Sequence, residues 1–189
     1  MKKILVASNN KGKINEIKEI FKEFEIYSLK DLGIKVDVEE DSTTFWGNAL
    51  KKAKEIAKNL EEDMLVLADD SGLCIDSLGG FPGVKTKRWM DGTDRDRNLG
   101  LIKKLEGIDK RECKFITAIA VADKKGSKAV EEIIQGKIAL SPKGENGFGF
   151  DEIFVLDNGK TLAELSDKEK NQISARKKAL EKMRKRIVK

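Results

Sequence analysis

The chain has no histidine among its 189 residues. This absence excludes Ser-His-Asp and Cys-His catalysis, together with zinc sites of the HExxH type. Any chemistry must therefore depend on carboxylates, lysines, hydroxyls and a hard metal ion. Because oxygen ligands suit Mg²⁺ or Mn²⁺, these are the cofactors that the composition favours.

Cysteines and long apolar runs are also scarce. The two cysteines, Cys74 and Cys113, do not have CxxC spacing, which favours free thiols in a reducing compartment. No apolar run approaches the length of a transmembrane helix, and Met1-Lys2-Lys3 does not begin a signal peptide. We therefore expect a cytoplasmic protein without a membrane partner.

Charged residues make up 38% of the chain, and the net charge is +5. Both signs are interspersed, which is typical of solvated helix faces. The basic residues near the C-terminus lack interleaved aromatic side chains and match no nucleic-acid-binding motif. They predict a solvated face rather than a nucleic-acid partner. These residues are Lys177, Lys178, Lys182, Arg184, Lys185, Arg186 and Lys189.

Helical and extended segments alternate along the chain, which predicts an α/β fold. Residues 4–7 and 65–68 have the composition of buried strands. Residues 115–121 and 129–140 resemble an antiparallel hairpin, so we expect a mixed sheet. The length predicts a single domain, residues 1–189, with room for two lobes.

Four helices are also expected. The apolar spacing from Ile14 to Phe24 fits one helix face, as does that from Phe45 to Leu60, and residues 98–105 have a helical pattern. Ser166 can cap the last helix while Glu169 reciprocates in a capping box. Lys170 and Arg176 would both lie on that last helix.

The polar segment from Ser8 to Lys13 lies between the first strand and the first helix. Small and amide side chains suit a tight turn there, and the helix N-terminus favours an anion. Lys13 would add a positive charge in the first turn, so phosphate is the expected ligand. An ordinary strand-to-helix turn with a solvated lysine is the alternative.

Two acidic clusters could carry the chemistry. Asp69-Asp70-Ser71-Gly72 is expected at the carboxyl end of a core strand, where α/β sheets place their ligands; a polar strand end with a Ser-Gly turn is the alternative. Glu39-Glu40-Asp41 precedes a helix, where negative charge is stabilising in any case. A nucleotide-borne Mg²⁺ needs only one or two protein carboxylates, which these clusters could supply.

The segment Phe148-Gly149-Phe150-Asp151 joins aromatic faces, a permissive glycine and an acid. Such a loop could stack on a base, although two phenylalanines beneath a turn could equally fill a core. Arg176 could form paired hydrogen bonds with a carbonyl or a phosphate.

Taken in order, these segments resemble the inosine triphosphate pyrophosphatase family, the XTP/dITP diphosphatases. The resemblance covers nearly the whole chain and rests on SNNKGKINE, the acidic stretch before TTFWGNA, ADDSGL, LGGFPGV, GFGFDEIF and AELSDKEKNQIS followed by Arg176. It implies an elongated mixed α/β fold with two lobes around a deep nucleotide cleft, and a homodimer. It also implies Mg²⁺-dependent hydrolysis of XTP, ITP and dITP to the monophosphate and pyrophosphate.

The resemblance also implies a role for individual residues. Asp70 would be the base that activates water and would hold Mg²⁺ together with Glu39. Glu40, Asp69 and Arg88 would be their neighbours. The remaining substrate-binding residues would be Ser8, Asn9, Asn10, Lys11, Gly12, Lys13, Ser71, Phe148, Gly149, Phe150, Asp151, Lys170, Ala175 and Arg176.

The chain departs from the family pattern at several of these positions. Ala175 stands where the family usually has a histidine that helps to read the purine. Gly47 replaces a usual glutamate, Phe150 a usual tyrosine and Glu152 a usual proline, while Lys87 replaces a small residue. These changes favour slower turnover or a shifted substrate preference.

Three other functions are compatible with parts of the sequence. A Maf-like pyrophosphatase acting on dTTP, UTP or modified pyrimidine nucleotides is the nearest, but the NKGK turn fits it less well. A nucleotide-binding protein with weakened catalysis would account for Gly47 and Ala175. A nucleic-acid-binding module is suggested only by the basic C-terminal helix.

Overall fold

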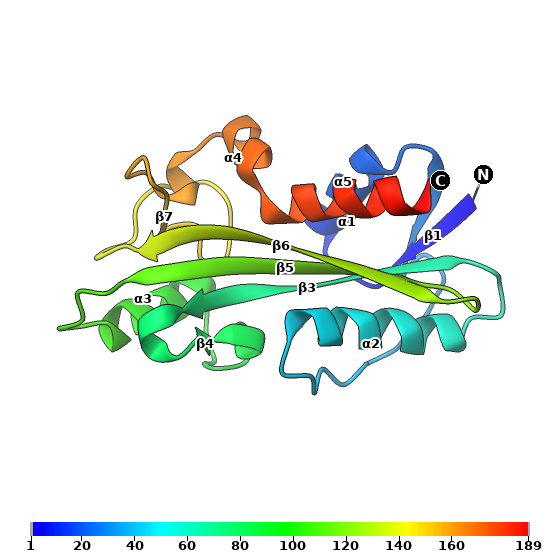
Figure 1. Cartoon of the computed structure of the whole chain (residues 1–189), viewed down its shortest axis with the longest axis horizontal. Coiled ribbons are helices and arrows are strands. Elements are labelled where there is room, and N and C mark those ends of the chain that lie inside the picture. The colour runs from blue at the N-terminus through cyan, green and yellow to red at the C-terminus, as the bar shows by residue number, and fades with distance from the viewer. Residues whose placement is uncertain (1, 189) are drawn as a thin grey trace. The chain divides into compact units, whose positions relative to one another are not determined.

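A mixed sheet forms the centre of the chain in the computed structural model, which describes residues 2–188. Its strands run in the order β2-β1-β3-β5-β6-β7, and β4 pairs with β3 (Figure 1). β1 is parallel to β2 and β3, whereas the β3–β4 and β6–β7 pairs are antiparallel. The expected mixed α/β class is thereby confirmed. The strands are β1 (Lys2–Val6), β2 (Phe24–Ser28), β3 (Leu65–Ile75), β4 (Phe81–Pro82), β5 (Glu112–Ala122), β6 (Ser127–Ile138) and β7 (Phe154–Val155).

Five α-helices and three short 3₁₀ helices accompany the strands within residues 2–188, and the last three of these helices follow β7. None of these helices is long and apolar enough to cross a membrane. The α-helices are α1 (Lys11–Ile20), α2 (Phe45–Lys58), α3 (Asp94–Lys104), α4 (Asp167–Ile173) and α5 (Ala175–Ile187). The 3₁₀ helices are η1 (Asp76–Leu78), η2 (Gly83–Lys85) and η3 (Leu162–Glu164).

The chain divides into two compact units. Unit 1 contains the residues up to Asp70, residues 117–132 and the residues from Arg176 onward. Unit 2 contains Ser71–Ile116 and Ile133–Ala175. Because β3, β5 and β6 each contribute residues to both units, the division runs across strands and not through a linker. The single domain expected from the length stays a prediction.

The core of unit 1 lies between the sheet and the pair of helices α1 and α5. Ile4 and Val6 of β1 pack with Ile17 of α1 and with Leu180 and Met183 of α5. In Figure 1, α1 and α5 lie on one side of the strands and α2 on the other. Leu5 is fully buried between Ile4 and Val6, and the two-residue period of a strand directs it to the α2 side.

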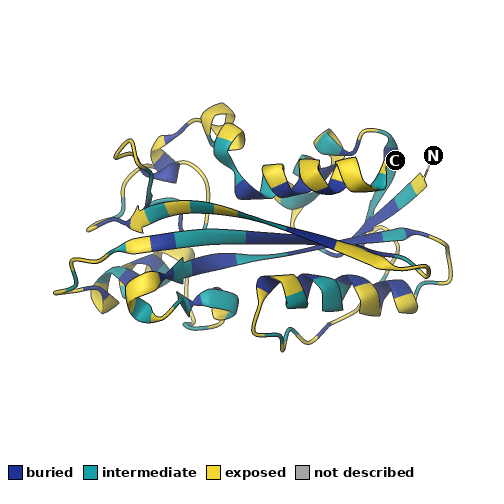
Figure 2. Ribbon diagram, in the orientation of Figure 1, coloured by how far each residue is buried: buried dark blue, intermediate teal, exposed yellow. Residues whose placement is uncertain are grey.

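The core of unit 2 joins the far ends of the long strands to α3 and to the segment around β7. Leu73 and Ile75 of β3 form a cluster with Leu101 of α3, Phe150 and Phe154. Figure 2 shows buried residues along the strands and exposed residues on the outer faces of the helices. Each unit therefore has its own apolar core.

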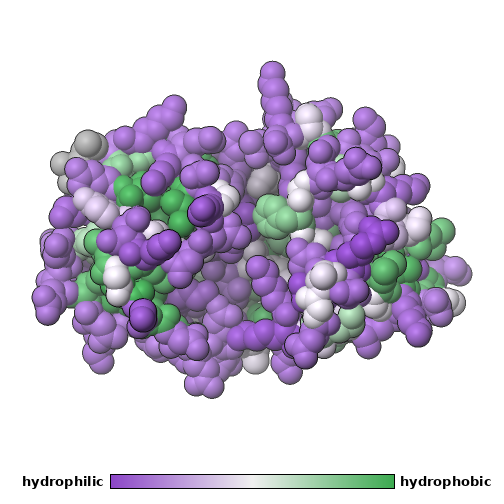
Figure 3. Space-filling model, turned by 180° about the vertical axis from the view of Figure 1, so that it is seen from behind, coloured by the Kyte–Doolittle hydropathy of each residue, from purple (hydrophilic) through white to green (hydrophobic). Residues whose placement is uncertain are grey.

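Exposed apolar side chains are scattered. On the face shown in Figure 3, hydrophilic side chains predominate and hydrophobic ones form separate patches. Scattered apolar side chains of this kind are normal on a protein surface. The large exposed ones among residues 2–188 are Leu32, Val36, Trp46, Leu99, Ile133, Leu140, Phe148 and Val188.

Three expected helix boundaries were wrong. Phe24 begins β2 instead of continuing the first helix, because α1 ends at Ile20 and the following segment pairs with β1. The last helix is interrupted at Ser174, whose backbone is non-helical (φ −53°, ψ 120°). The helix expected at residues 98–105 begins earlier, at Asp94, where Thr93 and Asp96 form a capping box. The Ser166–Glu169 capping box is confirmed.

The packing of α5 on the sheet can be tested with a matched pair of substitutions. Leu180 is fully buried, whereas Leu140 is 80% exposed. Leu180→Ala should lower the free energy of unfolding by about 2–5 kcal/mol, because it leaves a cavity. Leu140→Ala should change it by less than about 0.5 kcal/mol. Urea denaturation measures both values, and equal effects would contradict the observed packing.

Candidate active site

The unequal lengths of β1 and β3 place two carboxylates beside the first turn. Val6, the last residue of β1, is paired with Leu67, and the Ala7 N–H donates to the Leu67 carbonyl at 2.8 Å. β3 continues for eight more residues to Ile75. Asp69 and Asp70 therefore lie within this strand and not at its end, which corrects the expected strand boundary. They emerge where β1 gives way to the turn that leads into α1.

That turn is held by its own polar side chains. Ser8 Oγ accepts a hydrogen bond from the Asn10 N–H at 3.1 Å. Asn10 caps α1 by accepting the Lys13 N–H at 3.1 Å. The N–H groups of Lys11 and Gly12 belong to the first helical turn and have no intrahelical acceptor. Since Asn9, Lys11 and Gly12 are exposed, the turn offers an open helix N-terminus to an anion.

Asp69 lies among cations. Its Oδ2 is 2.5 Å from Lys13 Nζ and 3.6 Å from Arg176 Nε, and its side chain is only 5% exposed. Burial on its own would raise the pKa of Asp69, but the Lys13 ammonium and the Arg176 guanidinium outweigh burial and hold the pKa below its usual range. Asp69 is therefore an ionised counter-charge to Lys13 and Arg176.

Asp70 has a different environment. Its Oδ2 accepts a hydrogen bond from Asn48 Nδ2 at 3.1 Å. Burial raises the pKa of Asp70 to about 6, and the charges of Glu40 and Asp69 add to this effect. The Asn48 hydrogen bond and the charge of Lys52 oppose it. A carboxylate with a pKa near 6 is ionised at neutral pH and can still accept a proton, as a general base requires.

The two-residue period of the strand explains why neighbouring aspartates differ. Leu67 and Asp69 share the sheet face covered by α1 and α5, while Asp70 points to the α2 face. Leu67 accordingly packs in the core with α1 and α5. Lys13 and Arg176 come from α1 and α5, whereas Asn48 comes from α2. The strand therefore separates an ion-paired carboxylate from one with a raised pKa.

Asn48 and Lys52 were missed as site residues from the sequence. They lie one turn apart on α2, and Lys52 forms an ion pair with Glu40. Asn48 is fully buried and also accepts the Ser42 N–H at 2.9 Å through Oδ1. A polar residue within the apolar face of a helix was the available signal.

The first acidic cluster is only partly directed at Asp70. Glu40 is half-buried and its charge acts on Asp70. Glu39 is exposed, and its charge acts on Lys51. Asp41 also pairs with Lys51, at 2.8 Å. Of the two glutamates, Glu40 is therefore the one whose charge acts on Asp70, whereas the charge of Glu39 acts on Lys51.

Unit 2 holds the second group of expected site residues. Asp151 Oδ2 accepts the Phe148 N–H at 2.8 Å and forms an ion pair with Lys170. The Lys170 ammonium also lies 4.8 Å from the centroid of the Phe148 ring. Phe148 is 61% exposed, whereas Phe150 is buried in the core. Core filling and base stacking were the two alternatives for these rings. Phe150 fills the core, whereas Phe148 has an exposed face that is available for stacking.

The neighbouring Gly147 cannot be replaced without moving this group. Its φ is +80°, and a Cβ atom would lie 2.1 Å from Asp151 Oδ2. Three further expected residues lie elsewhere: Ser71 is half-buried in β3, Arg88 is exposed, and Ala175 is buried at the start of α5.

The donor set for a metal ion is small. Among residues 2–188 no group of three or more carboxylate, thiol or imidazole side chains is arranged to hold a metal. Asp69 already pairs with two cations, which leaves Asp70 with Glu40 and Glu39 as oxygen donors. This set fits a Mg²⁺ that is carried by phosphates and needs one or two carboxylates. It does not fit a metal held by the protein alone.

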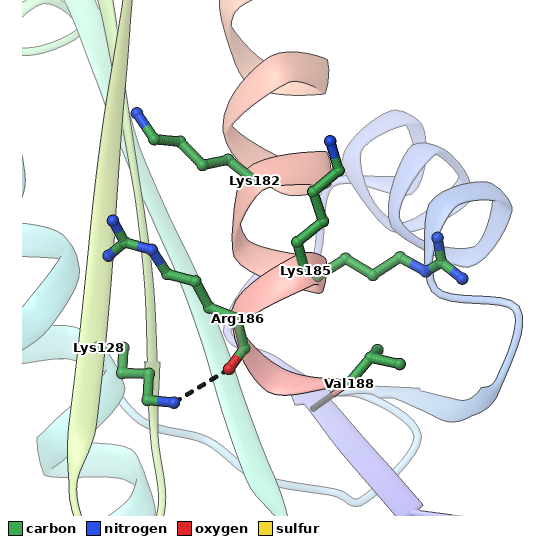
Figure 4. A pocket seen from close by; sticks show the side chains of 6 residues that line it. Lys128, Lys182, Lys185, Arg186 and Val188 are labelled. Carbon is green, nitrogen blue, oxygen red and sulfur yellow. Dashed lines mark hydrogen bonds between the residues drawn. The ribbon is translucent and has the colours of Figure 1, made fainter.

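A basic hollow on unit 1 provides a contrast. It is lined by Lys128, Lys182, Arg184, Lys185, Arg186 and Val188 (Figure 4). Lys128 Nζ donates to the Arg186 carbonyl at 3.0 Å, and the Lys182 and Arg184 side chains pair with glutamates at 2.7 Å. The labelled cations in Figure 4 point in different directions. These cations do not converge on one point.

Comparisons with known proteins agree over the whole chain. The family model described as Ham1 family matches residues 4–186. The dITP/XTP pyrophosphatase of Thermoanaerobacter sp. is 44% identical over 99% of this chain and 97% of its own. That of Bacillus subtilis is 42% identical over 98% and 96%.

Solved structures show the same agreement. The Ham1 protein of Staphylococcus aureus superposes with a TM-score of 0.92 at 36% identity, covering 99% of this chain and 98% of its own. A nucleoside-triphosphatase / dITP/XTP pyrophosphatase from Mycobacterium abscessus gives a TM-score of 0.82 at 38% identity, covering 96% and 98%.

Asparagine substitutions at the two aspartates should have opposite effects on stability at neutral pH. The folded pKa of Asp70 is raised from 3.8 to about 6, so the wild type loses stability as pH rises between these values. Asp70→Asn should therefore stabilise the protein at pH 8 by on the order of 1–3 kcal/mol, and the gain should vanish below about pH 4.

Asp69 gives the converse result. The pKa of Asp69 is lowered in the folded state. Its stabilising contribution to the free energy of unfolding is therefore present above the unfolded pKa and is lost as pH falls through the folded pKa. Asp69→Asn leaves Lys13 without its buried counter-charge and Arg176 with Glu16 alone, and it should cost about 3–5 kcal/mol at pH 8. Denaturant unfolding at several pH values measures both variants. The same sign for both at pH 8 would contradict this division between the aspartates.

Proposed function

The chain belongs to the Ham1 family, and on that basis we propose that it hydrolyses the non-canonical purine nucleoside triphosphates XTP, ITP and dITP. The products are the nucleoside monophosphate and pyrophosphate. The observation that carries this proposal is Asp70, a half-buried carboxylate that accepts a hydrogen bond from Asn48 and has a pKa of about 6, one residue from the Asp69 that pairs with Lys13 of the Ser8–Lys13 turn. Such a group can activate water next to bound phosphates.

The phosphates are assigned to the Ser8–Lys13 turn. Its free N–H groups and the positive end of α1 favour the triphosphate. Lys13 and Arg176 bring two positive charges, and both are held by carboxylates: Asp69 pairs with the two cations, and Glu16 Oε2 lies 3.7 Å from Arg176 Nη1. These ion pairs fix the positions of both cations beside the turn. Lys52, paired with Glu40, is a further cation close enough to act on Asp69 and Asp70.

Asp70 accepts the proton of the attacking water in this proposal. Asn48 donates to Asp70 Oδ2 and so leaves Oδ1 for the water. The bond that breaks lies between the α- and β-phosphates, and pyrophosphate leaves. Because burial and neighbouring negative charge keep the pKa near neutrality, Asp70 is ionised before the reaction and basic enough to take the proton.

Glu39 and Asp70, with Glu40 beside them, are the residues that we propose hold Mg²⁺, or Mn²⁺ in its place. The ion, when bound, would neutralise phosphate charge and polarise the reacting groups. Its positive charge would also favour the ionised form of Asp70. The pair Glu40–Lys52 keeps a further carboxylate within reach.

Phe148 and Lys170 are assigned to the base. The exposed ring of Phe148 supplies a stacking face, and the Lys170–Asp151 pair supplies polar groups beside it. Ala175, buried at the start of α5, presents no hydrogen-bonding side chain. We therefore propose that deaminated purines are preferred less sharply here than in relatives with a histidine at this position. A cytoplasmic homodimer is the proposed working form.

A pyrophosphate-release assay with a panel of nucleotides tests the function. XTP, ITP and dITP should release pyrophosphate at least about tenfold faster, in kcat/KM, than ATP, GTP, dTTP and UTP, a difference of about 1.4 kcal/mol. Pyrophosphate from dTTP or UTP alone would favour the Maf-like function instead. Binding of ITP without release would identify a protein with weakened catalysis.

Metal removal tests the assigned cofactor. Treatment with EDTA should abolish pyrophosphate release, and added Mg²⁺ or Mn²⁺ should restore it, because the carboxylates present suit only a phosphate-borne ion. Asp70→Asn should remain inactive with either metal. Full activity in EDTA would exclude the metal-dependent mechanism.

A further inference from the structure

A loop in unit 2, residues 147–152, is held by side chains from α3. Asp94 Oδ2 accepts the Gly149 N–H at 3.0 Å. Asn98 Nδ2 donates to the Gly149 carbonyl at 2.8 Å and to Glu152 Oε1 at 2.9 Å. Asp94 and Asn98 are four residues apart and so lie on the same face of α3. Together they form hydrogen bonds with both the N–H and the carbonyl of Gly149. We name the pair Asp94 and Asn98 the α3 clamp.

The orientation of Asn98 is determined by its partners. Gly149 O and Glu152 Oε1 are both acceptors, so the amide nitrogen and not the oxygen must face them. Asn98 is 1% exposed, and its Oδ1 is buried without a hydrogen-bond partner among residues 2–188. Burying half of an amide unpaired is unfavourable. The two donated bonds are therefore the contribution that Asn98 makes at this position.

The clamp determines where the Phe148 ring lies. Gly149 has φ of +65°, a left-handed conformation that a loop adopts readily at glycine. On the other side of Gly149, the Phe148 N–H is bound to Asp151, which pairs with Lys170. The backbone that carries Phe148 is therefore fixed from α3 on one side and from α4 on the other. The ring itself remains exposed.

We propose that Asp94 and Asn98 are positioning residues that hold Phe148 for stacking on the purine base. This rests on the proposed function, since it names the residues behind the assigned base contact. Neither residue touches the Ser8–Lys13 turn or Asp70 in any described contact. Loss of the clamp should therefore raise KM and leave kcat nearly unchanged, because base binding contributes equally to the ground and transition states.

The first experiment uses Asp94, whose side chain is 48% exposed and also pairs with Arg97 at 2.7 Å through Oδ1. Asp94→Ala should raise KM for ITP about tenfold, which is the scale of losing one base–aromatic stack. Asp94→Asn keeps an acceptor for the Gly149 N–H and should rescue KM. Asp109→Ala removes another exposed aspartate of unit 2 and controls for the charge. An unchanged KM in Asp94→Ala would overturn the proposal.

A competitor without a base separates positioning from general damage. Inorganic tripolyphosphate should inhibit wild type and Asp94→Ala with the same Ki, because it lacks the group that the clamp serves. A Ki that rises in parallel with KM would overturn the proposal, since it would show that the phosphate end is also affected.

Calorimetric titration separates this inference from the proposed function. Asn98→Asp places a carboxylate opposite two acceptors, the Gly149 carbonyl and Glu152 Oε1. The substitution is made in the Asp70→Asn protein, and the Kd for ITP is measured. A Kd raised about tenfold relative to Asp70→Asn alone supports the clamp, even if the wild type releases no pyrophosphate and the proposed function fails. Equal Kd values overturn the clamp alone, and absence of ITP binding in both proteins overturns the two together.

Discussion

Because side chains alternate between the two faces of a strand, Asp69 and Asp70 cannot share an environment, and the rest of the site depends on this constraint. Asp69 points toward α1 and α5, whose Lys13 and Arg176 keep it ionised. Asp70 points toward α2, where burial leaves it with a pKa of about 6. Two identical side chains one residue apart thereby become an ionised counter-charge and a carboxylate with a raised pKa.

The separation matters because the two tasks conflict. A carboxylate paired with two cations holds its charge but has little tendency to accept a proton. A half-buried carboxylate with one amide donor is a better base, and it destabilises the folded state at neutral pH. Unit 1 contains both, so the cost of the raised pKa at Asp70 is offset locally by the ion pairs of Asp69.

In unit 2 an exposed aromatic side chain is carried by a fixed backbone. Phe148 stays exposed while the peptide bonds around it are fixed by Asp94, Asn98 and Asp151. A rigid backbone lowers the entropic cost of contact with a ligand, so an exposed ring can still be an efficient contact. Phe150, two residues later, is buried and anchors the same loop in the core.

The sequence by itself determined the α/β class, the mixed sheet, the strand-to-helix turn at Ser8–Lys13 and the family, since these depend on local patterns and on motif order. It did not place the end of β3, because Asp69 to Gly72 look like a turn until their pairing with a neighbouring strand is known. Only the tertiary structure revealed that Asn48, Lys52 and Glu40 act on Asp70. It also revealed the break in the last helix at Ser174. The physical reason is that burial, pKa and pairing depend on residues distant in the chain. The sequence shows that Asp69 and Asp70 must point to opposite faces of the sheet. It does not show which helix covers each face.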